Sequence, residues 1–305
     1  MINRELIRQK VVQLLYAHYV NENHSSAKLR DELTMSLNKA YDLYLTLLSL
    51  LAEMGRLTDR NYDTALARAQ RMNTTPPSRR LVDNRFMKQL EANEQLKKYR
   101  EHQSIDWTDE EELVRSMLRD AMALDYVDDY VKSTEESTYE QERELWRYIY
   151  RNIVVGDERI DELLEDKNLY WNDDKEIIDT FVLKTINRFT PETTADMPLL
   201  PQYRNESDIE FAHTLMNESI VHEKELLTLI DQHTHGWRME RVAPIDRVIL
   251  QVALCEMQSF PSIPVSVSIN EYVEIAKHYS TPNASKYINA TLDNISKQLT
   301  LNKEV

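Results

Sequence analysis

The chain has 305 residues, enough to bury a substantial core in one large helical domain or in two smaller ones. Only 3 residues are glycine, which leaves almost none for tight turns, phosphate-binding loops or strand bulges. The formal net charge of -15 means that the average field of the protein cannot attract nucleic acid, so any RNA site must be a local basic patch. Since 29% of the residues are charged and alternating β-branched runs are few, we expect an all-α fold without a sheet of any size.

Cysteine use and hydropathy predict a cytoplasmic protein. The single cysteine, Cys255, lies in an apolar run and cannot form an internal disulfide, which fits a reducing compartment. Charged residues interrupt every apolar stretch near the N-terminus, so no hydrophobic core of a signal peptide is expected. The longest apolar stretch, residues 44–54, is about half of the roughly 20 residues that a membrane-spanning helix requires. We therefore expect no association with a membrane.

The first part of the chain predicts two helical segments followed by a clear break. Residues 3–20 carry apolar side chains at three- and four-residue spacing, which predicts one buried helix face and places Arg4 and Arg8 on a different, solvated face. A long helical region follows over residues 28–72. Two consecutive prolines disfavour helix and remove backbone donors, so residues 73–80 are predicted to form an exposed loop.

The middle of the chain predicts further helices and one linker. Helix is expected over residues 84–103. Residues 110–176 are strongly acidic but keep apolar residues at helical period, which indicates packed helices. Prolines and threonines between residues 189 and 205 make this segment the best candidate for a linker. The spacing of a helix capping box occurs three times, and predicts helix starts at Thr108, Ser207 and Ser268.

The C-terminal third is the most regular part of the sequence. Pro244 stands at a first-turn position, and the helix that follows it is apolar nearly all round, so we expect this helix to be central. The last helix is predicted to turn its isoleucines and leucines inward, which leaves Lys286 and Tyr287 near its exposed start.

The C-terminal third contains, in this order, Trp237, Val242-Ala-Pro-Ile-Asp-Arg-Val-Ile-Leu250, Ala253-Leu-Cys-Glu256, Ile263-Pro264, Ser268-Ile-Asn-Glu-Tyr-Val-Glu-Ile-Ala-Lys277 and Lys286-Tyr-Ile-Asn-Ala-Thr-Leu-Asp293. These segments together resemble the NusB family of transcription antitermination factors. The segment Arg8-Gln-Lys-Val-Val-Gln-Leu-Leu-Tyr16 looks like the first helix of the same family. The resemblance implies a NusB-like RNA-binding helical bundle over residues 1–20 and 206–305, and a helical, partly acidic insertion over residues 21–205 that can form a sub-bundle of its own.

The resemblance also implies a function and a set of site residues. It implies a factor that binds boxA, a single-stranded element of ribosomal RNA transcripts, together with the ribosomal protein NusE, within the RNA polymerase antitermination complex. Carried onto this sequence, the RNA-binding residues of the family are Arg4, Arg8, Asn283, Ser285, Lys286, Tyr287 and Asn289. Single-stranded RNA recognition needs such cations, aromatic faces and amide or hydroxyl groups. By family analogy, the partner-binding residues are Tyr16, Tyr19 and Glu240.

The sequence departs from the family pattern at both parts of the implied RNA site. The usual Phe-Val-Asn-Gly reads Tyr287-Ile-Asn-Ala290, the usual acidic, glycine-containing loop reads Ser280-Thr-Pro-Asn283, and Glu5 and Leu6 thin the arginine-rich N-terminus. Tyr287 keeps a stacking face, whereas the loss of N-terminal cations removes phosphate neutralisation. Basic residues of the insertion offer compensation: Arg79, Arg80, Lys88, Lys97, Lys98 and Arg100.

An alternative function is a non-catalytic protein-interaction scaffold of the transcription or ribosome-assembly machinery, in which acidic helices bind basic proteins. An enzyme is not expected. Asn270 and Glu271 have no nucleophile or base at a recognisable spacing, and the three glycines supply no glycine-rich turn for the cofactor of a methyltransferase. His222, His233 and His235 offer at most a weak metal site. We therefore expect no catalytic residue, no cofactor and no metal.

Overall fold

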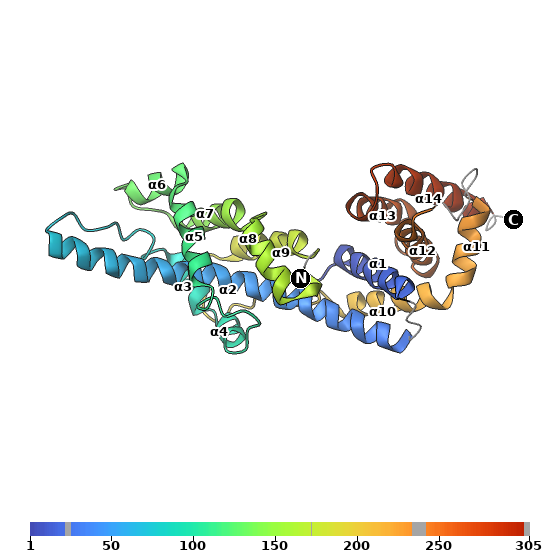
Figure 1. Cartoon of the computed structure of the whole chain (residues 1–305), viewed down its shortest axis with the longest axis horizontal. Coiled ribbons are helices and arrows are strands. Elements are labelled where there is room, and N and C mark those ends of the chain that lie inside the picture. The colour runs from blue at the N-terminus through green and yellow to red at the C-terminus, as the bar shows by residue number, and fades with distance from the viewer. Residues whose placement is uncertain (22–25, 172, 234–241, 302–305) are drawn as a thin grey trace. The chain divides into compact units, whose positions relative to one another are not determined.

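The computed structural model describes residues 1–21, 26–171, 173–233 and 242–301. These ranges are helical, and the strand-like pairing within them is an isolated bridge between Ile2 and Tyr203, which confirms the all-α prediction (Figure 1). The chain divides into two compact units. We call Met1 with residues 39–202 the insertion unit, and residues 2–38 with 203–305 the terminal unit.

One long helix contributes to both units. Helix α2 (Ser26–Met72) is continuous over 47 residues, and the division between the units falls within it, after residue 38. Leu29, Leu33 and Leu37 are spaced by four residues, so they share one face of α2. All three are buried, and they belong to the terminal unit. Residues 21–38 therefore group with the terminal unit here, whereas the sequence grouped them with the insertion.

The helices of the insertion unit lie around the second part of α2 (Figure 1). In chain order they are α3 (Arg85–Ala92), α4 (Glu94–Arg100), α5 (Glu111–Met122), α6 (Asp125–Lys132), α7 (Tyr139–Ile149), the π-helix η1 (Tyr150–Val154), α8 (Glu158–Lys167), the 3-10 helix η2 (Leu169–Trp171) and α9 (Lys175–Arg188). The buried indoles of Trp107 and Trp171 donate hydrogen bonds to the carbonyls of Thr46 and Lys39 at 3.0 and 2.8 Å. These bonds satisfy the two indole N–H groups while their rings fill the core.

A glycine lets α3 approach α2 closely. A Cβ atom at Gly55 would overlap the side chain of Met87 and come within 2.7 Å of the Glu91 carboxylate. The helix therefore uses glycine at this interior position despite its low helix propensity.

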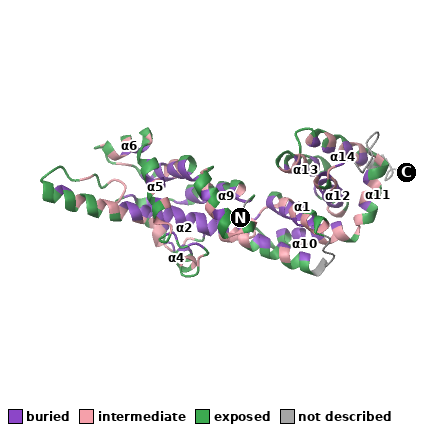
Figure 2. Ribbon diagram, in the orientation of Figure 1, coloured by how far each residue is buried: buried purple, intermediate pink, exposed green. Residues whose placement is uncertain are grey.

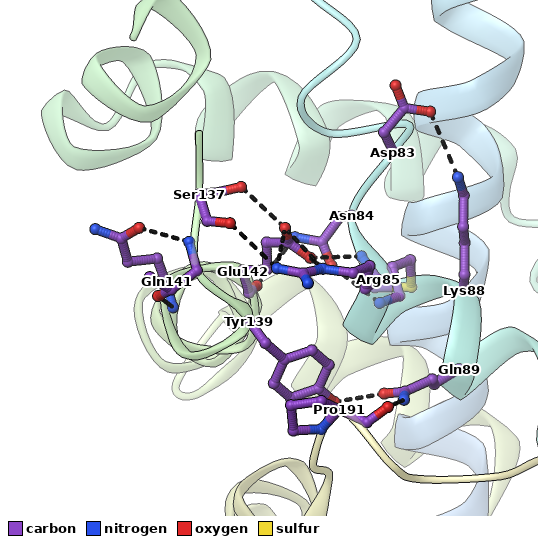
Figure 3. A network of polar contacts seen from close by, with 12 residues as sticks. Asp83, Asn84, Arg85, Lys88, Gln89, Ser137, Tyr139, Gln141, Glu142 and Pro191 are labelled. Atoms are coloured by element: carbon purple, nitrogen blue, oxygen red, sulfur yellow. Dashed lines mark hydrogen bonds and ion pairs between the residues drawn. The ribbon is translucent and has the colours of Figure 1, made fainter. Parts of the chain in front are cut away.

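A buried carboxylate joins α3 to α7. Glu142 accepts hydrogen bonds from the backbone N–H of Arg85 at 2.7 Å, from its guanidinium at 3.0 Å and from the Ser137 hydroxyl at 2.9 Å (Figure 3). The Asn84 amide donates to the Glu142 carbonyl at 3.0 Å. The first three bonds compensate the burial of the carboxylate, and all four fix the register of the two helices.

Asn93 divides the predicted helix over residues 84–103 into α3 and α4. Its side chain caps the first turn of α4, and its amide donates to the Met197 carbonyl at 2.8 Å. The second contact ties the segment 189–205 to the insertion unit. That segment contains no helix, as predicted, but it is packed rather than free, because Phe189 is fully buried.

The terminal unit is built around one central helix. Its helices are α1 (Arg4–Val20), the first part of α2, α10 (Glu206–Val221), α11 (Glu223–His233), α12 (Pro244–Ser259), α13 (Val265–Tyr279) and α14 (Ala284–Leu301). Helix α12 packs against α1, α10, α11, α13 and α14, and residues 248–256 within it are all buried. The central position and the first-turn role of Pro244 are as predicted.

The three predicted capping boxes are wrong. Helix α5 begins without a side-chain cap, and Ser268 lies inside α13, which begins at Val265. Asn205, rather than Ser207, caps α10. A capping box is present at the start of α7, between Thr138 and Gln141. The spacing alone therefore does not fix a helix start, because another residue, such as Asn205 or Pro264, can take the position before the first turn.

Candidate nucleic-acid interface

The start of α14 gathers five of the seven predicted RNA-binding residues. Asn283 precedes the helix, and Lys286 and Asn289 follow at three-residue spacing, so these three exposed side chains share one face. Ser285 and Tyr287 are half-buried beside it. We call these five residues the α14 face. Figure 2 shows exposed and intermediate residues at this end of α14.

A tight turn positions the α14 face. The backbone N–H of Ala284 donates to the Thr281 carbonyl at 2.9 Å, and that of Tyr287 donates to the Asn283 carbonyl at 3.2 Å. The Ser285 hydroxyl lies 3.4 Å from the Pro282 carbonyl. The helix therefore presents its positive dipole end beside the ammonium of Lys286, an arrangement that favours a phosphate.

Burial and two side chains, Thr291 and Asp246, determine the pKa shift of the Tyr287 hydroxyl. Burial raises the pKa of the Tyr287 hydroxyl and the charge of Asp246 raises it further, whereas a hydrogen bond with Thr291 opposes the shift. Burial likewise raises the pKa of Asp246, opposed by the Ser280 hydroxyl. The hydroxyl oxygen of Tyr287 is buried, and with its raised pKa it stays protonated at neutral pH. Sequence reasoning missed Asp246, because the spacing marks it as an ordinary first-turn residue of α12.

Arg8 is not on a solvated face, and that prediction is wrong. Only 4% of Arg8 is exposed. Its guanidinium donates to both carboxylate oxygens of Glu256 at 2.7 and 2.9 Å, and to Glu271 at 2.9 Å. Glu256 is fully buried and also accepts from Ser268 and Tyr272 at 2.7 and 2.9 Å. Arg8 therefore holds α1, α12 and α13 together, and its buried guanidinium pairs with two carboxylates within the protein.

Arg4 is partly accessible but does not join the α14 face. Its Nε lies 3.6 Å from the Asp208 carboxylate, and its guanidinium lies 4.8 Å from the centre of the Phe211 ring in α10. Gln13 of α1 donates to the Tyr279 hydroxyl at the end of α13. Arg4 precedes Gln13 by nine residues, about 14 Å along a helix axis. The predicted cations of α1 and the α14 face are therefore separate.

The predicted partner-binding residues also differ in accessibility. Tyr16 is exposed, whereas Tyr19 is half-buried and its hydroxyl accepts from Gln251 at 2.8 Å. Burial raises the pKa of Tyr19 to about 12. Glu240 lies outside the described residues. Val20, which sequence reasoning did not single out, is 56% exposed and follows Tyr16 by one turn, so the two form an exposed apolar stripe on α1.

The cations of the insertion are mostly engaged within it. Arg79 and Lys88 both pair with Asp83, and Arg100 pairs with buried Glu53 at 2.8 Å. The remaining three are Arg80, which lies over the ring of Tyr130, and the exposed Lys97 and Lys98. We therefore expect any compensation to come from the two exposed lysines of α4.

Two of the three histidines considered for a metal site, His222 and His233, lie in the described residues. His222 contacts Glu225 at 3.0 Å and Glu218 at 3.3 Å, and the hydrogen bond with Glu225 is the main cause that raises the pKa of His222. His233 contacts the Leu229 carbonyl, and His235 lies outside the described residues. Within the described ranges, no three side chains of histidine, cysteine, aspartate or glutamate form a group that could hold a metal. None of the helices described there has both the length and the apolarity to cross a membrane.

Comparison with known proteins places the similarity in the C-terminal part of the chain. A family model described as the NusB family matches residues 181–297. The transcription antitermination protein NusB of Symbiobacterium thermophilum is 37% identical over 117 residues, 38% of this chain and 73% of that protein. Its counterpart in Myxococcus xanthus is 36% identical over 96 residues, 32% of this chain and 69% of the relative. The protein of the same name in Koribacter versatilis is 40% identical over 89 residues, 29% of this chain and 61% of the relative.

Proposed function

Because the chain belongs to the NusB family of transcription antitermination proteins, we propose that it is a transcription antitermination factor that works in the cytoplasm without a catalytic step or a cofactor. We propose further that it binds boxA-type single-stranded RNA of ribosomal RNA transcripts, with NusE and the RNA polymerase antitermination complex as its partners. The observation that supports RNA binding is the α14 face, which combines an exposed cation, a half-exposed aromatic ring and two exposed amides on a helix start.

Each residue of the α14 face has a distinct task in this proposal. Lys286 and the positive end of α14 neutralise a phosphate, and the ring of Tyr287 stacks on a base. Asn283 and Asn289 carry both donors and acceptors, so they can hydrogen-bond base edges. Arg8 has no part in it, because its buried guanidinium pairs with Glu256 and Glu271. Arg4 contributes at most a peripheral phosphate contact.

We assign NusE to the exposed stripe of Tyr16 and Val20 on α1. An apolar stripe one turn long is too small for a whole interface, but it provides a central contact that neighbouring polar residues can surround. The hydrogen bond that Gln251 donates to the Tyr19 hydroxyl stabilises this part of α1.

Fluorescence anisotropy with a labelled boxA-like RNA tests the proposal, with and without NusE and across a salt series. We expect Tyr287→Ala to lose about 1–3 kcal/mol of binding free energy through lost stacking. Lys286→Ala should reduce the salt slope by about 0.7, the value for one phosphate of a single strand. Lys297→Ala is the matched control, because Lys297 is an exposed cation of the same helix that pairs with Asp293.

The outcomes separate the proposal from its alternative. Equal binding of boxA-like and scrambled RNA in the presence of NusE would exclude sequence recognition. If NusE binds while RNA makes no difference to its affinity, the protein is a non-catalytic interaction scaffold. If Lys297→Ala loses as much affinity for the RNA as Lys286→Ala, the net charge of the helix, and not the α14 face, governs RNA binding.

A further inference from the structure

The insertion unit contains an open groove that the proposed function does not use. Its volume is about 560 Å³, and it lies between α2, the loop that follows α2, α5 and the end of α6. The aliphatic part of its lining consists of Ala65, Leu81, Val82, Leu118, Met122 and Val131. Met122 is 38% exposed at the edge of this lining.

The charge of the groove is opposite to that of the unit around it. The lining includes two arginines, Arg115 and Arg119, and no carboxylate. By contrast, residues 39–202 contain 23 lysines and arginines against 34 aspartates and glutamates. A local positive charge on an acidic body favours a negatively charged ligand at this place.

One of the two arginines is available to a ligand. Arg115 pairs with Glu111 and donates to the Asn61 side chain at 3.2 Å. Arg119 is exposed, and within the described residues its guanidinium has no ion-pair partner. The neighbouring carboxylate Asp120 pairs with Arg159 at 2.9 Å instead. A planar guanidinium beside an apolar wall is suited to a carboxylate that is attached to an apolar chain.

We propose that this groove binds an acidic segment of a partner protein whose apolar side chains enter the groove and whose carboxylates meet Arg119. The volume lies within the range of about 300–1,000 Å³ typical of ligand sites. Single-stranded nucleic acid fits less well, because the walls are aliphatic and the ring of Tyr62 is already covered by Arg79 at 5.2 Å. The site is independent of the α14 face and of the proposed RNA binding.

Two labelled peptides of about 15 residues test this proposal by fluorescence anisotropy. Both carry leucine at helical spacing. One has glutamate at the remaining charged positions and the other has lysine. A labelled single-stranded oligouridine is the third probe. The variants are Arg119→Glu in the groove and, as matched control, Arg151→Glu, which reverses an exposed cation of η1 in the same unit. Far-UV circular dichroism confirms that both variants are folded.

We expect the glutamate peptide to bind, and to lose about tenfold or more in affinity with Arg119→Glu but not with Arg151→Glu. The lysine peptide should gain affinity for Arg119→Glu. In methyl NMR spectra, the Met122 methyl resonance should shift when the glutamate peptide is added. The proposal is overturned if the glutamate peptide does not bind, if it binds Arg119→Glu as tightly as the unchanged protein, or if oligouridine or the lysine peptide binds the unchanged protein more tightly.

Discussion

Removing the Arg8 side chain should destabilise the terminal unit without a specific effect on RNA. In Arg8→Ala, the carboxylate of Glu256 stays fully buried but loses its two charged donors, and keeps only the hydroxyls of Ser268 and Tyr272. Breaking a buried ion pair from one side costs about 3–5 kcal/mol, because the remaining charge is left uncompensated. We expect a loss of unfolding free energy in this range.

Urea unfolding followed by far-UV circular dichroism measures this loss, and Arg4→Ala is its control. The side chain of Arg4 is 38% exposed and its nearest carboxylate oxygen is 3.6 Å away, so its removal should cost less than about 1 kcal/mol. The double variant Arg8→Met with Glu256→Gln should recover part of the loss, because neither residue then carries an unpaired charge.

Two results would contradict this prediction for Arg8. If Arg8→Ala keeps the stability of the unchanged protein within about 1 kcal/mol, the ion pair is not buried as described. If Arg8→Ala also weakens RNA binding and lowers its salt slope by about 0.7, Arg8 is a phosphate contact after all.

Three further predictions concern the insertion unit. Glu142→Ala leaves the backbone N–H of Arg85 without its partner and should cost about 1–3 kcal/mol, measured by urea unfolding with tryptophan fluorescence. Gly55→Ala should lower stability by about 1–3 kcal/mol in the same assay, because the added methyl group overlaps Met87. Burial raises the pKa of Glu91 from 4.5 to about 7, so its stabilising contribution is complete below the lower value and is lost as the pH rises through the upper one. Glu91→Gln should therefore flatten the fall of the urea midpoint between pH 4.5 and about pH 7; an unchanged pH dependence would exclude Glu91 as its cause.

The helices were predictable from the sequence because their cores follow a local period. Ile7 and Val11 are fully buried at the spacing that predicted them, and the central place of α12 follows from its apolar residues on all sides. Helix starts were less predictable. Asn205 caps α10 in place of Ser207, since competing polar residues near a helix start are equivalent until the chain has folded.

The candidate site was predictable only where its residues are neighbours in sequence. Asn283 to Asn289 form one helix start, so their grouping follows from helical spacing. Arg8 was misplaced because its partner Glu256 is 248 residues away, and no local pattern reports such a contact. The groove beside Arg119 was not predicted for the same reason, since its walls come from three separate helices and a loop.

The continuity of α2 determines how a shortened chain must be designed. A version that joined residue 20 directly to residue 206 would discard Leu29, Leu33 and Leu37, and would expose the apolar surface that these side chains cover. A version that keeps residues 1–38 and rejoins the chain at Tyr203 retains them. In this protein the insertion unit does not start in a loop. It starts inside α2, so residues 26–38 of this helix have to be kept together with the rest of the terminal unit.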